Sequence, residues 1–177
     1  MARWRVQTVP MTESTDRTLL VLRHAKSDWS TGEADIDRTL TPRGHRQAAD
    51  VGGWLAEQAI SIDLAVVSPA ARARATWALV SAELRDDPEA RIDERAYAAS
   101  VSELLTIVRE LPDDLRTVLL VAHNPGLEAL VSVLSGDDIA LPTATLVVLR
   151  LTGRWAEAAP STAELLTSGR PPAAPLG

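Results

Sequence analysis

The stretch Thr18-Leu19-Leu20-Val21-Leu22-Arg23-His24 sets two basic side chains directly behind a short apolar run. An unbroken run with β-branched character and no polar alternation predicts a buried strand over residues 18–22. A strand that is apolar on both faces fits a sheet covered by helices on both sides. His24 therefore stands just beyond the carboxyl end of a predicted central strand.

A strand followed by polar residues recurs twice more along the chain. Residues 64–67 predict a second buried strand, and Ser68-Pro69 then begins a helix. Residues 117–122 predict a third strand, which His123 and Asn124-Pro125 follow. We expect Ser68 and Asn124 to be helix N-caps, with the prolines in the first turn. Strands that alternate with helices indicate an α/β architecture.

Further signals complete the set of predicted elements. Ser100 and Glu103 form a capping box that begins a helix. Two apolar runs around Thr152-Gly153 predict a hairpin with strands at 145–151 and 154–158. The remaining predicted elements are a helix over 41–59, capped by Thr41-Pro42, and a short strand over 91–93.

Composition limits the classes of partner and chemistry. The net charge of −6 disfavours nucleic acid or an anionic membrane as a partner. The absence of cysteine excludes disulfides, thiolate metal sites and cysteine nucleophiles. The chain has no run of about 18 apolar residues, and no apolar stretch follows the basic N-terminus. We therefore expect a cytoplasmic protein.

The 177 residues suit a single domain. Residues 1–17 are polar and without periodicity, and we expect them to be a flexible N-terminal extension. Residues 18–159 hold all the predicted elements and form the domain. Residues 160–177 are rich in Ala, Pro, Ser and Gly, and this composition predicts a disordered tail.

Basic residues follow the predicted strands at positions that should meet. In open α/β sheets, functional sites form beyond the carboxyl ends of the strands. If the three strands are neighbours, Arg23, His24, Arg72 and His123 converge at one edge of the sheet. Arg74 is a nearby rival to Arg72. The N-termini of the following helices add partial positive charge at the same edge.

Such a cluster suits phosphoryl transfer. Guanidinium groups bind the phosphoryl oxygens bidentately and stabilise the charge of the transition state. A neutral imidazole can accept the phosphoryl group covalently, and nearby arginine charge keeps it neutral. The three histidines lack the spacing of a metal site, so we expect neither a metal nor another cofactor.

Four motifs, in a fixed order, resemble the histidine phosphatase superfamily over about residues 18–150. Arg23-His24-Ala25-Lys26-Ser27 is similar to the RHG-type signature in its RHAKS form, in which Ala25 replaces the glycine. Leu40-Thr41-Pro42-Arg43-Gly44 through Gln47-Ala48 resembles the helix opening of the family. Ser68-Pro69-Ala70-Ala71-Arg72-Ala73, followed by Thr76, and Val121-Ala122-His123-Asn124-Pro125-Gly126 resemble the second-arginine and second-histidine motifs. The short length resembles the SixA-like phosphohistidine phosphatase branch.

The resemblance implies a three-layer α/β/α sandwich with a central mixed, mostly parallel sheet. It implies that His24 is the nucleophile and that Arg23, Arg72 and His123 hold the phosphoryl oxygens. A general acid in many relatives lies in a stretch similar to residues 92–97, which makes Glu94 the candidate and Asp93 the second choice. The implied reaction is hydrolysis through a phosphohistidine on His24.

Several nearby side chains keep two interpretations at this stage. Lys26 and Ser27 either line the substrate entrance or cap a turn, and Asn124 caps its helix whatever else it does. Asp35 and Asp37 are expected to be solvated charges, and His45 to lie on a solvated helix face. The five tryptophans are expected to pack in the core or at an interface.

The substrate has alternatives of different classes. The branch suggests a phosphorylated protein that carries phosphohistidine. A small phosphorylated metabolite is the rival substrate, and it would require an acid such as Glu94 to protonate an alkoxide. A mutase would need an enclosed pocket, for which the short chain has little material. A non-catalytic phosphate-binding module is the alternative outside the enzymes.

Overall fold

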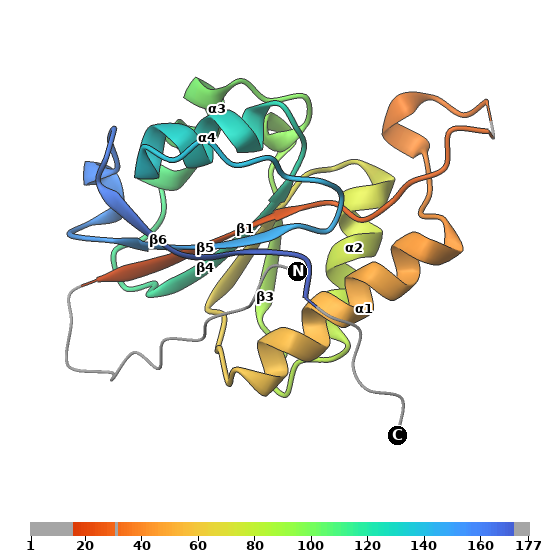
Figure 1. Cartoon of the computed structure of the whole chain (residues 1–177), viewed down its shortest axis with the longest axis horizontal. Helices are drawn as coiled ribbons and strands as arrows, with labels where there is room; N and C mark the ends of the chain where they lie inside the picture. The colour runs from red at the N-terminus through yellow and green to blue at the C-terminus, as the bar shows by residue number, and fades with distance from the viewer. Residues whose placement is uncertain (1–15, 31, 172–177) are drawn as a thin grey trace.

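The computed structural model describes residues 16–30 and 32–171. Its centre is a six-stranded sheet in the order β3-β2-β4-β1-β5-β6 (Figure 1). The strands are β1 Arg17–Arg23, β2 Leu64–Val67, β3 Glu89–Ile92, β4 Thr117–Ala122, β5 Leu146–Leu151 and β6 Ala163–Gly169. The first four in chain order pair in parallel, and β5 is antiparallel to both β1 and β6. The expectation of a mixed, mostly parallel sheet is confirmed.

Helices cover both faces of this sheet, with α1 and α2 on one side and α3 and α4 on the other (Figure 1). Their bounds are α1 Pro42–Glu57, α2 Ala71–Ser81, α3 Val101–Arg109 and α4 Gly126–Ser135, and the short 3-10 turns are η1 Asp35–Asp37, η2 Glu94–Ala96 and η3 Trp155–Glu157. None of the helices in the described part of the chain is long and apolar enough to cross a membrane.

The apolar runs of the strands explain the three layers. Successive side chains of a strand point to opposite faces of its sheet. Leu19 and Val21 of β1 therefore pack in the core beneath α3 and α4, and Leu20 and Leu22 pack in the core against α1 and α2. All four are fully buried. A central strand without polar alternation is thus what a sheet covered on both faces requires.

Two sequence predictions near the C-terminal end are wrong. Residues 160–177 were expected to be disordered, yet Ala163–Gly169 form β6 and extend the sheet beyond residue 159. This strand forms because its leucines bury apolar surface: Leu165 packs against the core beneath α3 and α4, and Leu166 packs against the core beneath α1 and α2. The second hairpin strand expected at 154–158 is instead η3, where the buried Trp155 indole donates to the Leu115 carbonyl.

Two helix starts also differ from the prediction. The helices begin at Ala71 and Gly126, and neither has a side-chain cap. Ser68 and Asn124 therefore do not serve as N-caps, and their side chains are free for contacts in the site. The capping box of Ser100 and the Thr41 cap are confirmed. Residues 1–15 of the expected N-terminal extension and residues 172–177 of the expected tail lie outside the described residues, and β1 begins at Arg17.

Candidate active site

A cavity of about 300 Å³ opens beyond the carboxyl ends of β1 and β4. Because β1 and β4 are parallel neighbours, with Arg23 opposite Ala122 in the register, His24 and His123 leave the sheet side by side. Their ring centroids lie 5.0 Å apart. The predicted site residues that line this cavity are Arg23, His24, Lys26, Ser27, Arg72, His123 and Asn124.

The two ring nitrogens of His24 have different partners. Nδ1 lies 2.8 Å from the Ala25 carbonyl oxygen, which can only accept a hydrogen bond. The neutral ring therefore carries its proton on Nδ1, and the lone pair on Nε2 accepts from Arg72 Nε at 3.3 Å. Burial, and then the charges of Arg72, Arg23 and Arg38, lower the pKa of His24 to about 4. His24 is consequently neutral at pH 7 and presents an unprotonated nitrogen to the arginine.

The loop after His24 is held by the residues that form the other motifs. Thr76 Oγ1 accepts from the Ala25 amide, and Gln47 Oε1 accepts from the Lys26 amide. The Lys26 carbonyl accepts from the backbone amide and the hydroxyl of Thr41. A Cβ on Gly44 would lie 2.1 Å from that same carbonyl oxygen, so only glycine lets α1 approach this closely. These contacts fix the orientation of His24 relative to α1 and α2.

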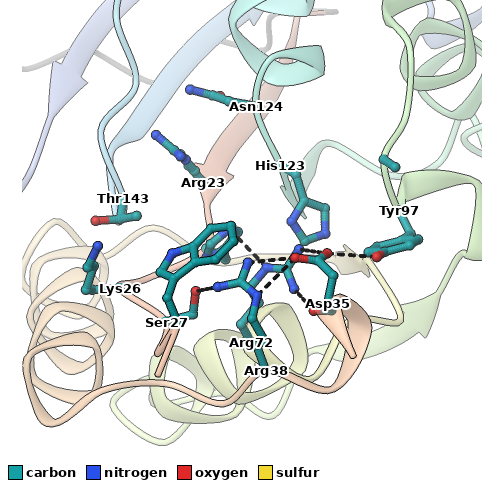
Figure 2. Close-up of a pocket in the computed structure, with 13 residues that line it drawn as sticks. Arg23, Lys26, Ser27, Asp35, Arg38, Arg72, Tyr97, His123, Asn124 and Thr143 are labelled. Carbon is teal, nitrogen blue, oxygen red and sulfur yellow. Dashed lines mark hydrogen bonds and ion pairs between the residues drawn. The ribbon is translucent and has the colours of Figure 1, made fainter. Parts of the chain in front are cut away.

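Arg72 connects Nε2 of His24 to a carboxylate. Its Nε donates to His24 Nε2, and its Nη2 forms a 2.9 Å ion pair with Asp35 Oδ2. The Nη1 group donates to the backbone carbonyl of Asp35. Hydrogen bonds from Tyr97, Arg38 and Arg72 hold the pKa of Asp35 far below its usual range. Asp35 is therefore ionised, and it lies on the guanidinium group that would receive a phosphoryl anion (Figure 2).

His123 has its hydrogen-bond partner on Nε2, whereas the loop contact of His24 is on Nδ1. Nε2 lies 2.7 Å from Ser68 Oγ, while the buried Nδ1 has no partner in the described structure. Ser68 Oγ accepts from the Ala70 amide, and its own proton can be donated to His123 Nε2. The neutral ring would then carry its proton on Nδ1. Burial, followed by the nearby His24 and Arg72, lowers the pKa of His123 to about 3.

Arg23 and Asn124 share one acceptor at the back of the cavity. Arg23 Nη1 and Asn124 Nδ2 donate to the Leu141 carbonyl at 2.7 and 3.0 Å. This bond replaces the helix cap expected for Asn124. Burial lowers the pKa of Arg23, but a guanidinium remains charged at neutral pH. The Arg23 guanidinium and the Asn124 amide therefore line one wall of the cavity as fixed polar groups.

Three functional residues of the cavity were not among the sequence-based candidates. Asp35 is not simply a solvated charge, because it pairs with Arg72 and Arg38. Arg38 also donates to Ser27 Oγ at 2.8 Å, so Ser27 binds this arginine rather than capping a turn. The Tyr97 hydroxyl donates to Asp35 Oδ2 at 2.8 Å. Lys26 lines the cavity and is exposed.

Glu94 lies outside the cavity. It is exposed in η2 and is not among the lining residues. Asp93, the second choice, is buried and binds Arg95 through both carboxylate oxygens. Neither side chain therefore lines the cavity, and the role of Glu94 as general acid stays a prediction. The stretch enters the site through Tyr97 instead.

The cavity holds many positive groups and one carboxylate. Of the described lining residues, Asp35 is the only acidic one. No cluster of three or more potential metal ligands occurs among the described His, Asp and Glu side chains. The arrangement is suited to binding an anion such as a phosphoryl group beside a neutral imidazole nitrogen.

Comparison with known proteins gives consistent matches. The model of the family described as "Histidine phosphatase superfamily (branch 1)" matches residues 19–101. The uncharacterised protein MT1313 of Mycobacterium tuberculosis (strain CDC 1551 / Oshkosh) is 38% identical over 156 residues, which cover 82% of this chain and 96% of that protein. An uncharacterised chloroplastic protein of Arabidopsis thaliana, At3g52155, is 32% identical and covers 82% and 72% of the two chains.

Solved structures extend the comparison to the fold. A protein from Nakamurella multipartitia, provisionally named phosphohistidine phosphatase SixA, superposes with a TM-score of 0.79 at 32% identity. The match covers 88% of this chain and 96% of that one. A protein from Agrobacterium tumefaciens with the same provisional name gives a TM-score of 0.76 at 26% identity, with coverage of 88% and 98%.

Proposed function

Because the chain belongs to the histidine phosphatase superfamily, in its SixA-like branch, and is a phosphatase, we propose that it hydrolyses phosphohistidine on proteins through a covalent intermediate on His24. The observation that carries this proposal is the hydrogen bonding of His24. The Ala25 carbonyl holds the ring proton on Nδ1, so the Nε2 lone pair is directed to Arg72. A nucleophile beside an anion-binding guanidinium is what transfer to His24 requires.

The phosphoryl group would be held by three further side chains. Arg72 would bind two phosphoryl oxygens with the edge that now contacts His24 and Asp35. Arg23 and the Nδ1–H of His123 would bind oxygens from the opposite wall. For this to happen, the Asp35 carboxylate must release Arg72, since both anions use the same guanidinium nitrogen. Asp35 thus keeps Arg72 oriented until a phosphoryl group replaces it.

The two chemical steps balance without a cofactor. In the first, His24 Nε2 attacks phosphorus, and the electron pair of the breaking P–N bond leaves with the donor imidazole. In the second, water attacks the phosphohistidine at His24, the Nε2–P bond breaks, and inorganic phosphate leaves. The electron pair of the breaking bond returns to His24 Nε2, and the protons of the attacking water leave with inorganic phosphate. Asp35, whose low pKa makes it a weak base, can orient this water by accepting a hydrogen bond.

The state of Asp35 also bears on the substrate class. An alkyl phosphate has an alkoxide leaving group and needs an acid to protonate it. The only carboxyl group among the described lining residues has a pKa held far below its usual range. A phosphohistidine ring protonated on its other nitrogen leaves as neutral imidazole and needs no such acid. This difference supports phosphohistidine over a phosphomonoester.

Rapid-quench labelling tests the proposal. Wild type and His24→Ala are mixed with a phosphohistidine peptide or with an aryl phosphate, and acid-labile phosphate on the protein is measured over time. Transient labelling of wild type alone, with faster turnover of the phosphohistidine peptide, is expected. If the wild type is labelled by neither donor and turns over neither, the proposal fails. Faster turnover of the aryl phosphate would instead favour an ester substrate.

A further inference from the structure

Trp29 is exposed at the edge of the cavity. Its side chain is 74% exposed, although it lines the same cavity as His24. Trp77 and Trp155 are 8% and 0% exposed, and they pack in the two cores as tryptophan usually does. Of the two positions expected for the tryptophans, the core or an interface, Trp77 and Trp155 occupy the core, whereas Trp29 lies outside both cores. Exposed aromatic surface beside a polar cavity is typical of a ligand-binding site.

One face of Trp29 lies on a fixed cation. The Arg38 guanidinium carbon lies 3.6 Å from the centroid of the ring. Arg38 is only 6% exposed, and three groups hold it: the Asp35 carboxylate, Ser27 Oγ and the Asp28 carbonyl. The guanidinium group is therefore unable to follow the indole into solvent. Trp29 is oriented by this cation–π contact while most of its surface stays accessible.

The other aromatic rings of the cavity are already engaged. His24 and His123 are each 7% exposed, and Tyr97 packs edge-on against His123 while its hydroxyl binds Asp35. Figure 2 shows Tyr97 and Asp35 on one side of the cavity and Lys26 and Thr143 on the other. Trp29 is thus the aromatic group of the described lining that can offer a free face to a molecule entering the cavity.

We propose that Trp29 stacks on the flat ring that carries the phosphoryl group and so selects phosphohistidine over donors that have no ring. This inference rests on the proposed function and names the part of the substrate that is recognised. When His24 Nε2 attacks in line, the imidazole of the donor lies on the far side of phosphorus and extends outward from the cavity. Its flat faces can then lie against the Trp29 indole. Loss of such a stack weakens binding by about tenfold, toward the lower end of what stacking on an aromatic side chain contributes.

A purely structural role for Trp29 has a different signature. If the indole only shields the Arg38–Asp35 ion pair from water, its loss disturbs the phosphoryl site itself. Every donor would then be affected to the same degree. Stacking, in contrast, affects only donors with a ring, and it acts mainly through KM. A pair of P–N donors that differ in the ring separates the two roles.

The test measures kcat/KM for a phosphohistidine peptide and for phosphoramidate, whose leaving group is ammonia. The variants are Trp29→Leu, which keeps apolar cover over Arg38, and Trp29→Tyr, which keeps an aromatic face. Ile92→Ala is the matched control, since Ile92 is an exposed hydrophobic residue (47%) that does not line the cavity. Because Trp29 is exposed, none of these changes should alter the thermal midpoint by much.

The expected result is a fall of about tenfold in the ratio of the two kcat/KM values for Trp29→Leu, mainly from a higher KM for the peptide. Trp29→Tyr should recover most of the ratio, and Ile92→Ala should retain it. An unchanged ratio in Trp29→Leu overturns the inference, whether both activities fall together or neither falls. If the wild type turns over phosphoramidate but not the peptide, the inference and the phosphohistidine substrate both fail, whereas the covalent mechanism on His24 stands. If the wild type turns over neither donor, the covalent mechanism fails too.

Discussion

The loop after β1 and the loop after β4 place a histidine at the same point of the fold and give it different surroundings. Both strands are central and parallel, and both histidines are 7% exposed. His24 binds a backbone carbonyl through Nδ1 and presents Nε2 to Arg72. His123 binds the Ser68 hydroxyl through Nε2 and leaves Nδ1 without a partner.

The group that binds one ring nitrogen of an imidazole, its outer partner, decides whether the other nitrogen can donate or accept in the cavity. The Ala25 carbonyl holds the His24 proton on Nδ1, so His24 offers a lone pair on Nε2, which is what a nucleophile needs. When the Ser68 hydroxyl donates to Nε2 of His123, that ring offers an N–H on Nδ1, which is what binding of a phosphoryl oxygen needs. Two identical side chains thereby take the complementary roles proposed above.

Replacing the proposed nucleophile should have the largest effect. His24→Ala removes Nε2, so turnover of any phosphoryl donor should fall by about 10³-fold or more. The control is His45→Ala, because His45 is exposed on α1 and outside the cavity. Initial rates together with far-UV circular dichroism measure the outcome. Comparable activity in the two folded variants would show that His24 is not the nucleophile.

Removing the guanidinium that His24 faces should have the next largest effect. Arg72→Ala deletes two charge-assisted bonds to the phosphoryl group, each worth about 1.5–3 kcal/mol. We expect kcat/KM to fall by at least about 100-fold, the lower limit of this range. Arg74→Ala, two residues along α2 and exposed, should retain activity. A larger loss in the Arg74 variant would show that the second-arginine motif had been aligned on the wrong residue.

The parts of this site that could be predicted are those that depend on strands. Leu19 and Leu22 mark a buried strand by composition alone, and the carboxyl ends of parallel strands meet at one edge. The convergence of His24, Arg72 and His123 therefore follows from short apolar runs. The same reasoning found α1 and α3, since their caps are local and need no tertiary contact.

The parts that could not be predicted depend on tertiary contacts. Asp35 and Arg38 reach the cavity because the loop between β1 and α1 folds back, with Ser27 bridging to Leu40. No local pattern indicates such a return. Ser68 has the composition of a helix cap, yet its hydroxyl binds a histidine 55 residues away. Asn124 is similar, since its amide binds the Leu141 carbonyl instead of a helix end.

Removing the hydroxyl that contacts His123 tests whether this partner sets the tautomer of the ring. Ser68→Ala removes the hydroxyl that favours the Nδ1–H form, so His123 should populate both neutral tautomers. We expect kcat/KM to fall about fivefold, because one neutral hydrogen bond contributes about 1 kcal/mol. Long-range ¹H–¹⁵N correlation spectra report the tautomer directly.

Ser81→Ala, at the partly exposed last residue of α2, is the control for Ser68→Ala. The His24 signals should keep their wild-type pattern in both variants, since the Ala25 carbonyl is untouched. An unchanged His123 tautomer in Ser68→Ala would show that the hydroxyl does not set it.

The smallest effect expected is on stability in acid. Burial lowers the pKa of His24 to about 4 and that of His123 to about 3, against 6.5 for the ordinary group. Between these lowered pKa values and pH 6.5, the unfolded chain therefore binds more protons than the folded protein. The contribution of each neutral ring is complete above about pH 6.5 and is lost as the pH falls through the folded pKa.

The thermal midpoint should consequently fall by less between pH 7 and pH 4.5 in His24→Ala than in wild type or in His45→Ala. Removing His24 takes away one group that must gain a proton on unfolding, whereas His45 is exposed and leaves that linkage in place. Differential scanning calorimetry at matched ionic strength measures the three curves. An equal fall in the thermal midpoint in all three proteins would mean that the fold does not hold His24 neutral. The surroundings of His24 in the loop after β1 would then not determine its charge.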